Sequence, residues 1–209
     1  MSNRRIAVLI SGRGSNLQAL IDAVAAKALD ATIAVVISNR AGAAGLERAH
    51  AAGIPAVTLP HRDYASREAF EAALVEALRA HDVALVCLAG FMRVLGPTFL
   101  AAFAGRTVNV HPSLLPSFPG VDAQRQALEH GVKVAGATVH IVTGELDGGP
   151  IVAQGVVSVL DDDTADTLSA RILEVEHRIY PEAVAAILDG GWTIDGGRFR
   201  APRPRSASA

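Results

Sequence analysis

Two polar side chains, Asn109 and His111, stand two positions apart and could act on the same group of a substrate. Residues 107–111 have the pattern of a buried strand, and alternate residues of a strand point to one face of the sheet. We therefore expect the amide and the imidazole to aim at one point. Such a pair of donors suits a carbonyl oxygen that gains negative charge during acyl transfer.

Asp147 is a candidate partner for this histidine. It lies in the glycine-rich segment 145–150 (ELDGGP), where a turn could bring its carboxylate against the imidazole. A nearby negative charge favours the protonated form of a histidine. The sequence thus predicts a catalytic site made of Asn109, His111 and Asp147, although a single asparagine or histidine near a strand end is more commonly a hydrogen-bonded loop residue.

The segment 11–17 (SGRGSNL) is a candidate binding site for an anion. Gly12 and Gly14 permit a sharp turn and a close approach of ligand to backbone, so a side chain at position 14 is expected to intrude on the ligand. Ser15 and Asn16 stand at the start of an expected helix, where free N–H groups and the helix dipole favour negative charge. A phosphate monoester fits best, and the alternative is a plain turn between strand and helix.

A dinucleotide is a poorer candidate for this segment. The third glycine of a dinucleotide-binding turn is missing. In addition, the second expected strand ends in Ser38, Asn39 and Arg40, where an NAD site would place an acidic residue for the ribose. A single phosphate is therefore favoured over a pyrophosphate.

The elements that must hold these residues alternate, up to about residue 130, between apolar runs and alanine-rich helical segments. This is the pattern of repeated strand-helix-strand units and a parallel sheet. Strands are expected over residues 6–10, 32–37, 56–59, 84–88 and 107–110. Helices are expected over residues 16–28, 44–52, 66–81 and 98–104, with Ser66 as an N-cap.

The pattern changes after residue 130. Two extended runs, 137–142 and 151–159, could pair as an antiparallel hairpin, which would make the sheet mixed. A long helix is expected over about residues 164–188, before a pair of glycines that would end it. These elements predict an α/β fold, doubly wound, with a mostly parallel sheet and helices on both faces.

Composition narrows the class of protein. With 209 residues, 50% of them hydrophobic and 4% aromatic, the chain fits one domain whose core is built from Ala, Val, Leu and Ile. The net charge of −2 does not favour nucleic-acid binding, which needs an excess of Lys and Arg. Cys87 is the single cysteine, so neither an intrachain disulfide nor a zinc cluster is expected, and a reducing cytoplasm is indicated.

The two ends of the sequence carry no pattern for export or for a membrane. The apolar run after Arg4 and Arg5 is too short for a signal peptide, and no run approaches the length of a membrane span. Residues 1–197 are expected to form a single cytoplasmic domain. Residues 198–209, rich in arginine, are expected to be a disordered tail rather than a basic contact arm.

Five motifs, in this order and spacing, resemble the phosphoribosylglycinamide formyltransferases, also called glycinamide ribonucleotide transformylases, a branch of the folate-dependent formyltransferases. They are residues 9–18 (LISGRGSNLQ), 88–93 (LAGFMR), 109–116 (NVHPSLLP), 145–150 (ELDGGP) and 176–181 (EHRIYP). The similarity spans roughly residues 5–188. The Asn, His and Asp belong to the wider family, whereas the phosphate segment and the last motif are specific to this branch.

The resemblance implies a seven-stranded mixed sheet, no metal, and two small-molecule substrates. These are glycinamide ribonucleotide and the co-substrate 10-formyltetrahydrofolate, whose formyl group would pass to the nucleotide amine in purine synthesis. We expect a monomer or homodimer without nucleic-acid or membrane partners.

The resemblance also implies two sets of binding residues. By match of motif, the nucleotide would contact Gly14, Ser15, Asn16 and Glu176. The formyl-folate would contact Arg67, Leu88, Met92, Arg93, Val94, Leu95, Val142 and Leu146. Taken from the sequence alone, the apolar members after residue 90 could equally belong to the core. One segment departs from the family: residues 121–125 (VDAQR) lack the one or two histidines common there, which puts any auxiliary role of this loop in doubt.

Three alternatives share part of these features. Formyltetrahydrofolate hydrolase and the catalytic part of methionyl-tRNA formyltransferase would use the same Asn, His and Asp. The first normally carries an N-terminal regulatory domain and the second a C-terminal tRNA-binding domain, and 209 residues are expected to leave no room for either. The third alternative is a non-catalytic module that binds folate or nucleotide.

Overall fold

The computed structural model describes residues 3–202, which form a seven-stranded sheet with helices on both faces and a separate two-stranded hairpin. The strands of the large sheet are, in spatial order, β3 (Ala56–Thr58), β2 (Thr32–Ser38), β1 (Arg5–Ile10), β4 (Leu85–Leu88), β5 (Thr107–His111), β6 (Val134–Ile141) and β7 (Ile151–Ser158). Strands β3 to β5 in this order are parallel, and β6 is antiparallel to both of its neighbours. The predicted mixed, doubly wound α/β fold is confirmed.

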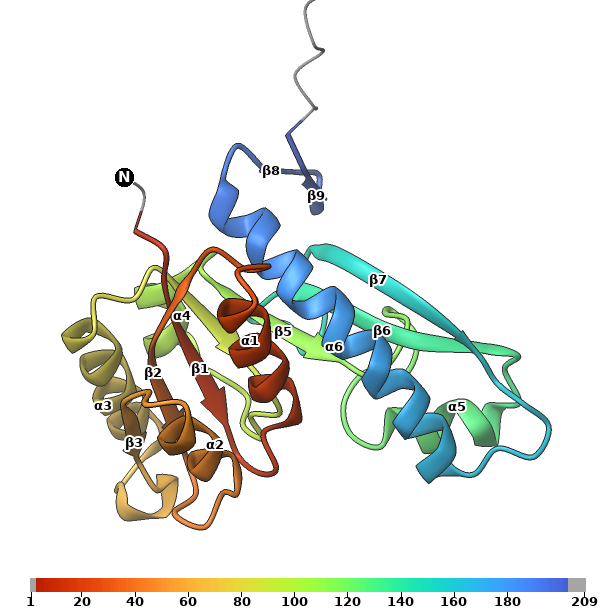
Figure 1. Cartoon of the computed structure of the whole chain (residues 1–209), viewed down its shortest axis with the longest axis horizontal. Coiled ribbons are helices and arrows are strands. Elements are labelled where there is room, and N and C mark those ends of the chain that lie inside the picture. The colour runs from red at the N-terminus through yellow and green to blue at the C-terminus, as the bar shows by residue number, and fades with distance from the viewer. Residues whose placement is uncertain (1–2, 203–209) are drawn as a thin grey trace, which may run out of the picture.

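The helices divide between the two faces of the sheet. They are α1 (Ser15–Ala25), α2 (Gly45–Ala51), α3 (Arg67–Ala80), α4 (Pro97–Phe103), α5 (Ala123–His130) and α6 (Ala165–Asp189), with a short 3-10 turn at His61–Asp63. Helices α1 and α6 lie beside each other across one face (Figure 1). Helices α3 and α4 pack on the other face, over a second apolar cluster.

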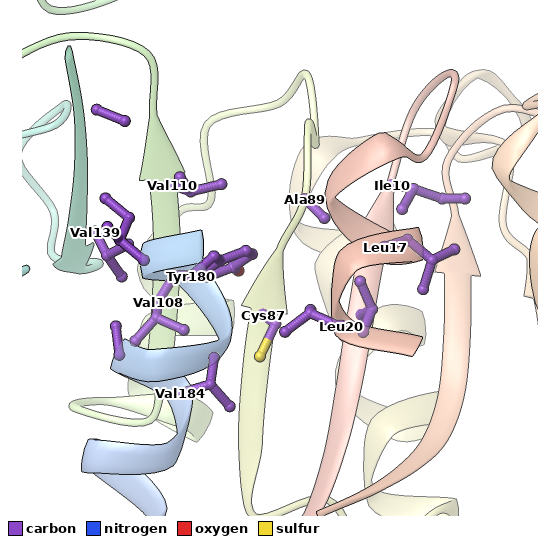
Figure 2. Close-up of a cluster of buried hydrophobic side chains, with 14 of the residues drawn as sticks. Ile10, Leu17, Leu20, Cys87, Ala89, Val108, Val110, Val139, Tyr180 and Val184 are labelled. Atoms are coloured by element: carbon purple, nitrogen blue, oxygen red, sulfur yellow. The ribbon is translucent and has the colours of Figure 1, made fainter. Parts of the chain in front are cut away.

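Helix α6 holds the larger core together. Its side chains Tyr180 and Val184 pack against Val108 of β5, beside Cys87 of β4 (Figure 2). The Tyr180 hydroxyl is buried, and it donates a hydrogen bond to the carbonyl of Leu88 at 2.9 Å. Because an unpaired buried hydroxyl is costly, this bond fixes α6 over the junction of β4 and β5.

The helix starts follow local sequence signals. Ser66 accepts a hydrogen bond from the backbone N–H of Ala69, as its predicted N-cap role requires. At the start of α6, Thr164 and Thr167 form a reciprocal capping box, and the helix ends at Asp189, with Gly190 as its C-cap. Within residues 3–202, no helix is both long enough and apolar enough to cross a membrane.

The structure differs from the expected elements at several places. Helix α1 ends at Ala25, three residues before the expected end at residue 28. Helix α5 follows the loop after β5 and was not expected, because it is mostly polar and buries only Ala123 and Ala127. Strand β6 begins at Val134, three residues before the expected start at residue 137.

A further difference is at the C-terminal end of the expected domain. Strands β8 (Thr193–Asp195) and β9 (Arg198–Arg200) pair as a hairpin, so the boundary expected at residue 197 falls inside regular structure. The turn is made by Gly196 and Gly197, and Trp192 stacks on Phe199 with ring centroids 5.4 Å apart. Residues 203–209 of the expected tail lie outside the described residues.

Candidate active site

The strand β5 presents Asn109 and His111 on one face, as its alternation predicts. Val108 and Val110, which alternate with them, belong to the core beneath α1 and α6 (Figure 2). The polar pair therefore lies on the sheet face opposite α6. Antiparallel pairing with β6 puts His140 directly across from Asn109, and Thr138 across from His111.

The structure brings Asn109, His111 and Asp147 together, with His140 as a fourth member. His111 Nδ1 lies 3.5 Å from Asp147 Oδ2, and His140 Nε2 lies 3.6 Å from Asp147 Oδ1. Asn109 Nδ2 lies 3.3 Å from His140 Nε2. The carboxylate thus faces two imidazoles, and the second imidazole contacts the amide.

His140 was missed from the sequence. The segment that contains it was expected to be a strand, but its partner and register on the β5 side were not predicted. A signal was present, because His140 stands between Val139 and Ile141 in a predicted strand, and in the structure its side chain is 2% exposed. A buried histidine in such a strand needs hydrogen-bond partners, which here come from the site.

Asp147 is held by its turn and by backbone contacts. Its φ of 51° is in the left-handed region, and Gly149 packs so tightly on the Ile141 carbonyl that a Cβ atom would collide with it. The backbone N–H of Gly120 donates to Asp147 Oδ2 at 2.8 Å. The glycines of the segment 145–150 therefore serve this close approach.

The electrostatic surroundings keep Asp147 ionised. Burial by itself raises the pKa of this carboxyl group. The contact with His140, the Gly120 N–H and the charge of His111 outweigh burial and hold the pKa below its usual value. At neutral pH the site therefore contains a fixed negative charge next to both histidines.

Both ring nitrogens of His111 face acceptors of the protein. Nε2 lies 2.9 Å from the carbonyl oxygen of Phe118, while Nδ1 faces Asp147. A carbonyl oxygen only accepts, so Nε2 carries a hydrogen. A substrate oxygen would have to replace the Phe118 carbonyl to receive the Nε2 hydrogen bond.

The segment 11–17 forms the turn that was expected between β1 and α1. Helix α1 begins at Ser15, with Gly14 as its N-cap at φ 72°. The first N–H groups of a helix have no acceptor within it, so the turn offers donors to an anion. The expected intrusion of a side chain at position 14 on a bound phosphate stays a prediction. A Cβ atom on Gly14 would lie 2.7 Å from Gly45 Cα of α2, whereas one on Gly12 would meet nothing within 4 Å. Gly14 is thus required by packing, and Gly12 borders open space.

Glu176 and Asn16 meet beneath this turn. Asn16 Nδ2 donates to Glu176 Oε2 at 2.7 Å, and Glu176 is 6% exposed. Burial raises the pKa of Glu176 to about 7, although the hydrogen bond from Asn16 lowers it in part. Asn16 Oδ1 is buried without a hydrogen-bond partner, so a donor from a ligand would satisfy it.

The residues expected to contact folate separate into exposed and buried sets. Met92, Val94 and Leu146 are 62%, 57% and 56% exposed, so their side chains are open to a ligand. Leu88 and Leu95 belong to the core under α3, and Val142 packs against that core. The exposed set can line a pocket directly, and the buried set lies behind it.

The two arginines of the expected folate set already have protein partners. Arg67 is paired with Glu71 at 2.9 Å and donates to the Val94 carbonyl at 2.8 Å. The Arg93 guanidinium lies 5.5 Å from the ring centroid of Phe70. Arg67 therefore helps to fix the segment that carries Val94.

Cys87 is buried at the centre of the sheet, where burial raises the pKa of its thiol to about 12 despite a hydrogen bond with Tyr180. Such a thiol stays protonated at neutral pH and cannot act as a nucleophile. In the part of the chain that the structure describes, no group of three or more His, Cys, Asp or Glu side chains is placed to hold a metal ion.

Comparisons with known proteins agree on one family. The profile of the family described as "Formyl transferase" matches residues 4–184. The crystal structure of glycinamide ribonucleotide transformylase 1 from Symbiobacterium toebii has a TM-score of 0.94 at 55% identity, and the match covers 96% of this chain and 94% of that chain. Phosphoribosylglycinamide formyltransferase of Escherichia coli (strain K12) is 48% identical over 185 residues, which are 88% of this chain and 87% of the relative.

A longer relative matches over a small part of its length. The trifunctional purine biosynthetic protein adenosine-3 of Drosophila melanogaster is 51% identical over 189 residues, which are 90% of this chain but 14% of that protein. The chain thus corresponds to one portion of this relative. The bacterial relative, in contrast, matches over most of both sequences.

Proposed function

The chain belongs to the formyl transferase family, and we propose that it transfers the formyl group of 10-formyltetrahydrofolate to the amine of glycinamide ribonucleotide. The products are formylglycinamide ribonucleotide and tetrahydrofolate, and the reaction is a step of purine biosynthesis. The observation that carries this proposal is the meeting of Asn109, His111 and Asp147 on one sheet face in a chain similar to named transformylases. On the same grounds we assign the enzyme to the cytoplasm.

The reaction is a direct acyl transfer. The amine nitrogen attacks the formyl carbon and forms a carbon–nitrogen bond, and the bond between that carbon and the folate nitrogen then breaks. The tetrahedral intermediate between these steps carries an oxyanion. Asn109 donates a hydrogen bond to it, and protonated His111 stabilises it by its charge and by exchanging the Phe118 carbonyl for the oxyanion.

Asp147 has two duties in this scheme. Its negative charge stabilises the imidazolium of His111. It also orders a water molecule that carries the proton lost by the amine to the departing folate nitrogen. The proton that the amine loses is thus the one that the folate nitrogen gains, and no covalent enzyme intermediate is needed.

His140 acts as a positioning residue for Asn109. His140 Nδ1 lies 3.1 Å from the carbonyl oxygen of Ile141, which can only accept, so Nδ1 carries a hydrogen. Nε2 lies 3.3 Å from Asn109 Nδ2 and 3.6 Å from Asp147 Oδ1. These contacts hold the Asn109 amide against the ring while the amide donates to the substrate.

The nucleotide lies over the start of α1. Its phosphate is bound by the turn at Gly14, Ser15 and Asn16, where free N–H groups favour an anion. Its sugar or amine end donates to Glu176 and to the unpartnered Oδ1 of Asn16. A buried acceptor without a partner supports a ligand that brings hydrogen-bond donors to this position.

The folate lies against the loop that follows β4. Met92, Val94 and Leu146 contact its pteridine, with Leu88, Leu95 and Val142 packed behind them. Arg67, which bonds to the Val94 carbonyl, faces the folate carboxylates, and Arg93, beside Phe70, also contacts the folate. The exposure of the first three side chains supports an apolar wall for a flat ring.

The test is formyl transfer measured with the two purified substrates. Active protein gives formylglycinamide ribonucleotide, and replacement of His111 by Ala lowers kcat by about 100-fold while both ligands still bind, because the oxyanion exists only in the transition state. Release of formate at the same rate without nucleotide would indicate a hydrolase instead. Binding of both ligands without either reaction would indicate a non-catalytic module.

A further inference from the structure

Ser11 joins the two loops that carry the proposed substrate sites. It directly follows β1 and is 3% exposed. Its backbone N–H donates to the carbonyl of Gly90 at 3.1 Å, and its hydroxyl oxygen accepts from the backbone N–H of Met92 at 2.8 Å. One residue of the phosphate turn therefore makes two hydrogen bonds to the loop after β4.

The hydroxyl of Ser11 is itself oriented by Asn39. It donates to Asn39 Oδ1 at 2.6 Å, and Asn39 is 2% exposed at the end of β2. Asn39 Nδ2 in turn lies 3.3 Å from His61 Nδ1. The donor hydrogen of the serine is thus committed to Asn39, and its lone pair points to Met92.

From this geometry we propose that Ser11 is a positioning residue that couples binding of the two substrates. The inference rests on the proposed function, since it takes the turn 11–17 as the nucleotide site and the Met92 loop as the folate site. A phosphate held by the turn fixes Ser11, and Ser11 then fixes the Met92 backbone. By linkage, a folate that orders the Met92 loop tightens nucleotide binding by the same factor.

The hydrogen bond between Ser11 and Met92 is costly to break because Ser11 is buried. If either loop moved by itself, the Met92 N–H or the Ser11 hydroxyl would be left unpaired away from water, which is more costly than losing a bond at the surface. The two loops are therefore expected to become ordered together.

Ser38 provides a matched control. It ends β2, lies opposite Ile10 in the register with β1, and is 0% exposed. Its hydroxyl, however, bonds only to the backbone of Arg40, two residues away. Replacing Ser38 by Ala removes a buried hydroxyl at the same sheet edge without touching the Met92 loop.

The experiment is calorimetric titration of glycinamide ribonucleotide, with and without a saturating folate analogue that carries a non-transferable group on nitrogen 10. The ratio of the two nucleotide dissociation constants is the coupling factor. We expect about fivefold or more for the wild type and for Ser38→Ala, and less than about twofold for Ser11→Ala. A Ser11→Ala factor equal to that of the wild type, or no coupling in the wild type, overturns the inference.

A second variant covers the case in which Ser11→Ala does not fold. Asn39→Ala leaves the hydroxyl in place but removes its acceptor, so the coupling factor is expected to fall part of the way; an unchanged factor counts against the inference. The wild type is assayed for formyl transfer in parallel. Absence of transfer refutes the proposed function, whereas normal transfer with an unchanged factor in the variants refutes only the role of Ser11.

Discussion

Two carboxyl groups of the proposed site differ in charge because their surroundings differ. Asp147 is partly buried, with a side chain that is 10% exposed, whereas Glu176 is a buried residue at 6% exposure. Asp147 faces two imidazoles and a backbone N–H, which hold its pKa below the usual value. Glu176 has only the neutral amide of Asn16, and burial raises its pKa to about 7. The depth of burial and the neighbouring groups together therefore assign the charge.

The same two regions are also built in different ways. The proposed nucleotide site would use backbone N–H groups of a single short turn, so it would depend on glycines and on packing. The proposed reaction site would use side chains from β5, β6 and the turn after β6, so it would depend on strand register. Substitutions in the proposed reaction site should therefore lower turnover. Substitutions in the proposed nucleotide site should instead lower the stability of the fold or the affinity for nucleotide.

The largest effect is expected at Asp147. Asp147→Asn keeps the size of the side chain but removes the charge that stabilises the imidazolium, so kcat should fall by about 1,000-fold. Single-turnover formyl transfer measures this, with nucleotide titration and circular dichroism as checks on binding and folding. A rate near that of the wild type would remove Asp147 from the mechanism.

Glu176 should show its effect in stability. Its native pKa of about 7 lies above the ordinary value of 4.5, so the native state keeps a proton that the unfolded state has lost between these pH values. The free energy of unfolding should therefore decrease by about 3 kcal/mol as pH rises from 4.5 to 7, and stay level above. In Glu176→Gln this decrease should be absent.

Urea unfolding at pH 5 and pH 8 tests this prediction. Glu174→Gln is the matched control, because Glu174 is exposed on the same helix. The control should keep the pH dependence of the wild type. If Glu176→Gln kept it too, the carboxyl group would be ionised in the native state throughout this range.

Substitutions at Gly12 and Gly14 should distinguish an effect on the packing of the turn from an effect on nucleotide binding. Gly14→Ala strains a residue at φ 72° and places Cβ 2.7 Å from Gly45 Cα, so it should destabilise the fold by about 2 kcal/mol. Gly12→Ala meets no protein atom within 4 Å, so stability should hold while nucleotide affinity falls by about tenfold. Thermal unfolding and nucleotide titration of both variants measure the two effects, and a shared pattern would argue against the distinction.

The smallest effect is expected at His140. Because one hydrogen bond contributes about 1 kcal/mol, His140→Ala should lower kcat by about fivefold with little change in KM for either substrate. His140→Gln, which can still form a hydrogen bond with Asn109, should recover part of the loss. Equal loss in both variants would indicate that the imidazole itself takes part in the reaction.

Much of the fold could be predicted because its signals are local. Apolar runs placed each of the seven strands of the large sheet, and the caps at Ser66 and Thr164 placed two helices. Helix α5 and the β8–β9 hairpin could not be found in this way. The first buries few apolar side chains, and the second is short and mostly exposed, with Trp192 and Phe199 as its packed pair.

The sequence by itself determined which side chains share a face and which turn begins a helix, because alternation in a strand and capping at a helix start depend on neighbours in the chain. It therefore placed Asn109 beside His111 and the glycine turn before α1. Only the tertiary structure decided that His140 stands across from Asn109, that Gly14 packs on Gly45, and that Ser11 reaches the Met92 loop. These contacts join residues far apart in sequence, so they follow from strand register and loop packing, which no local pattern encodes.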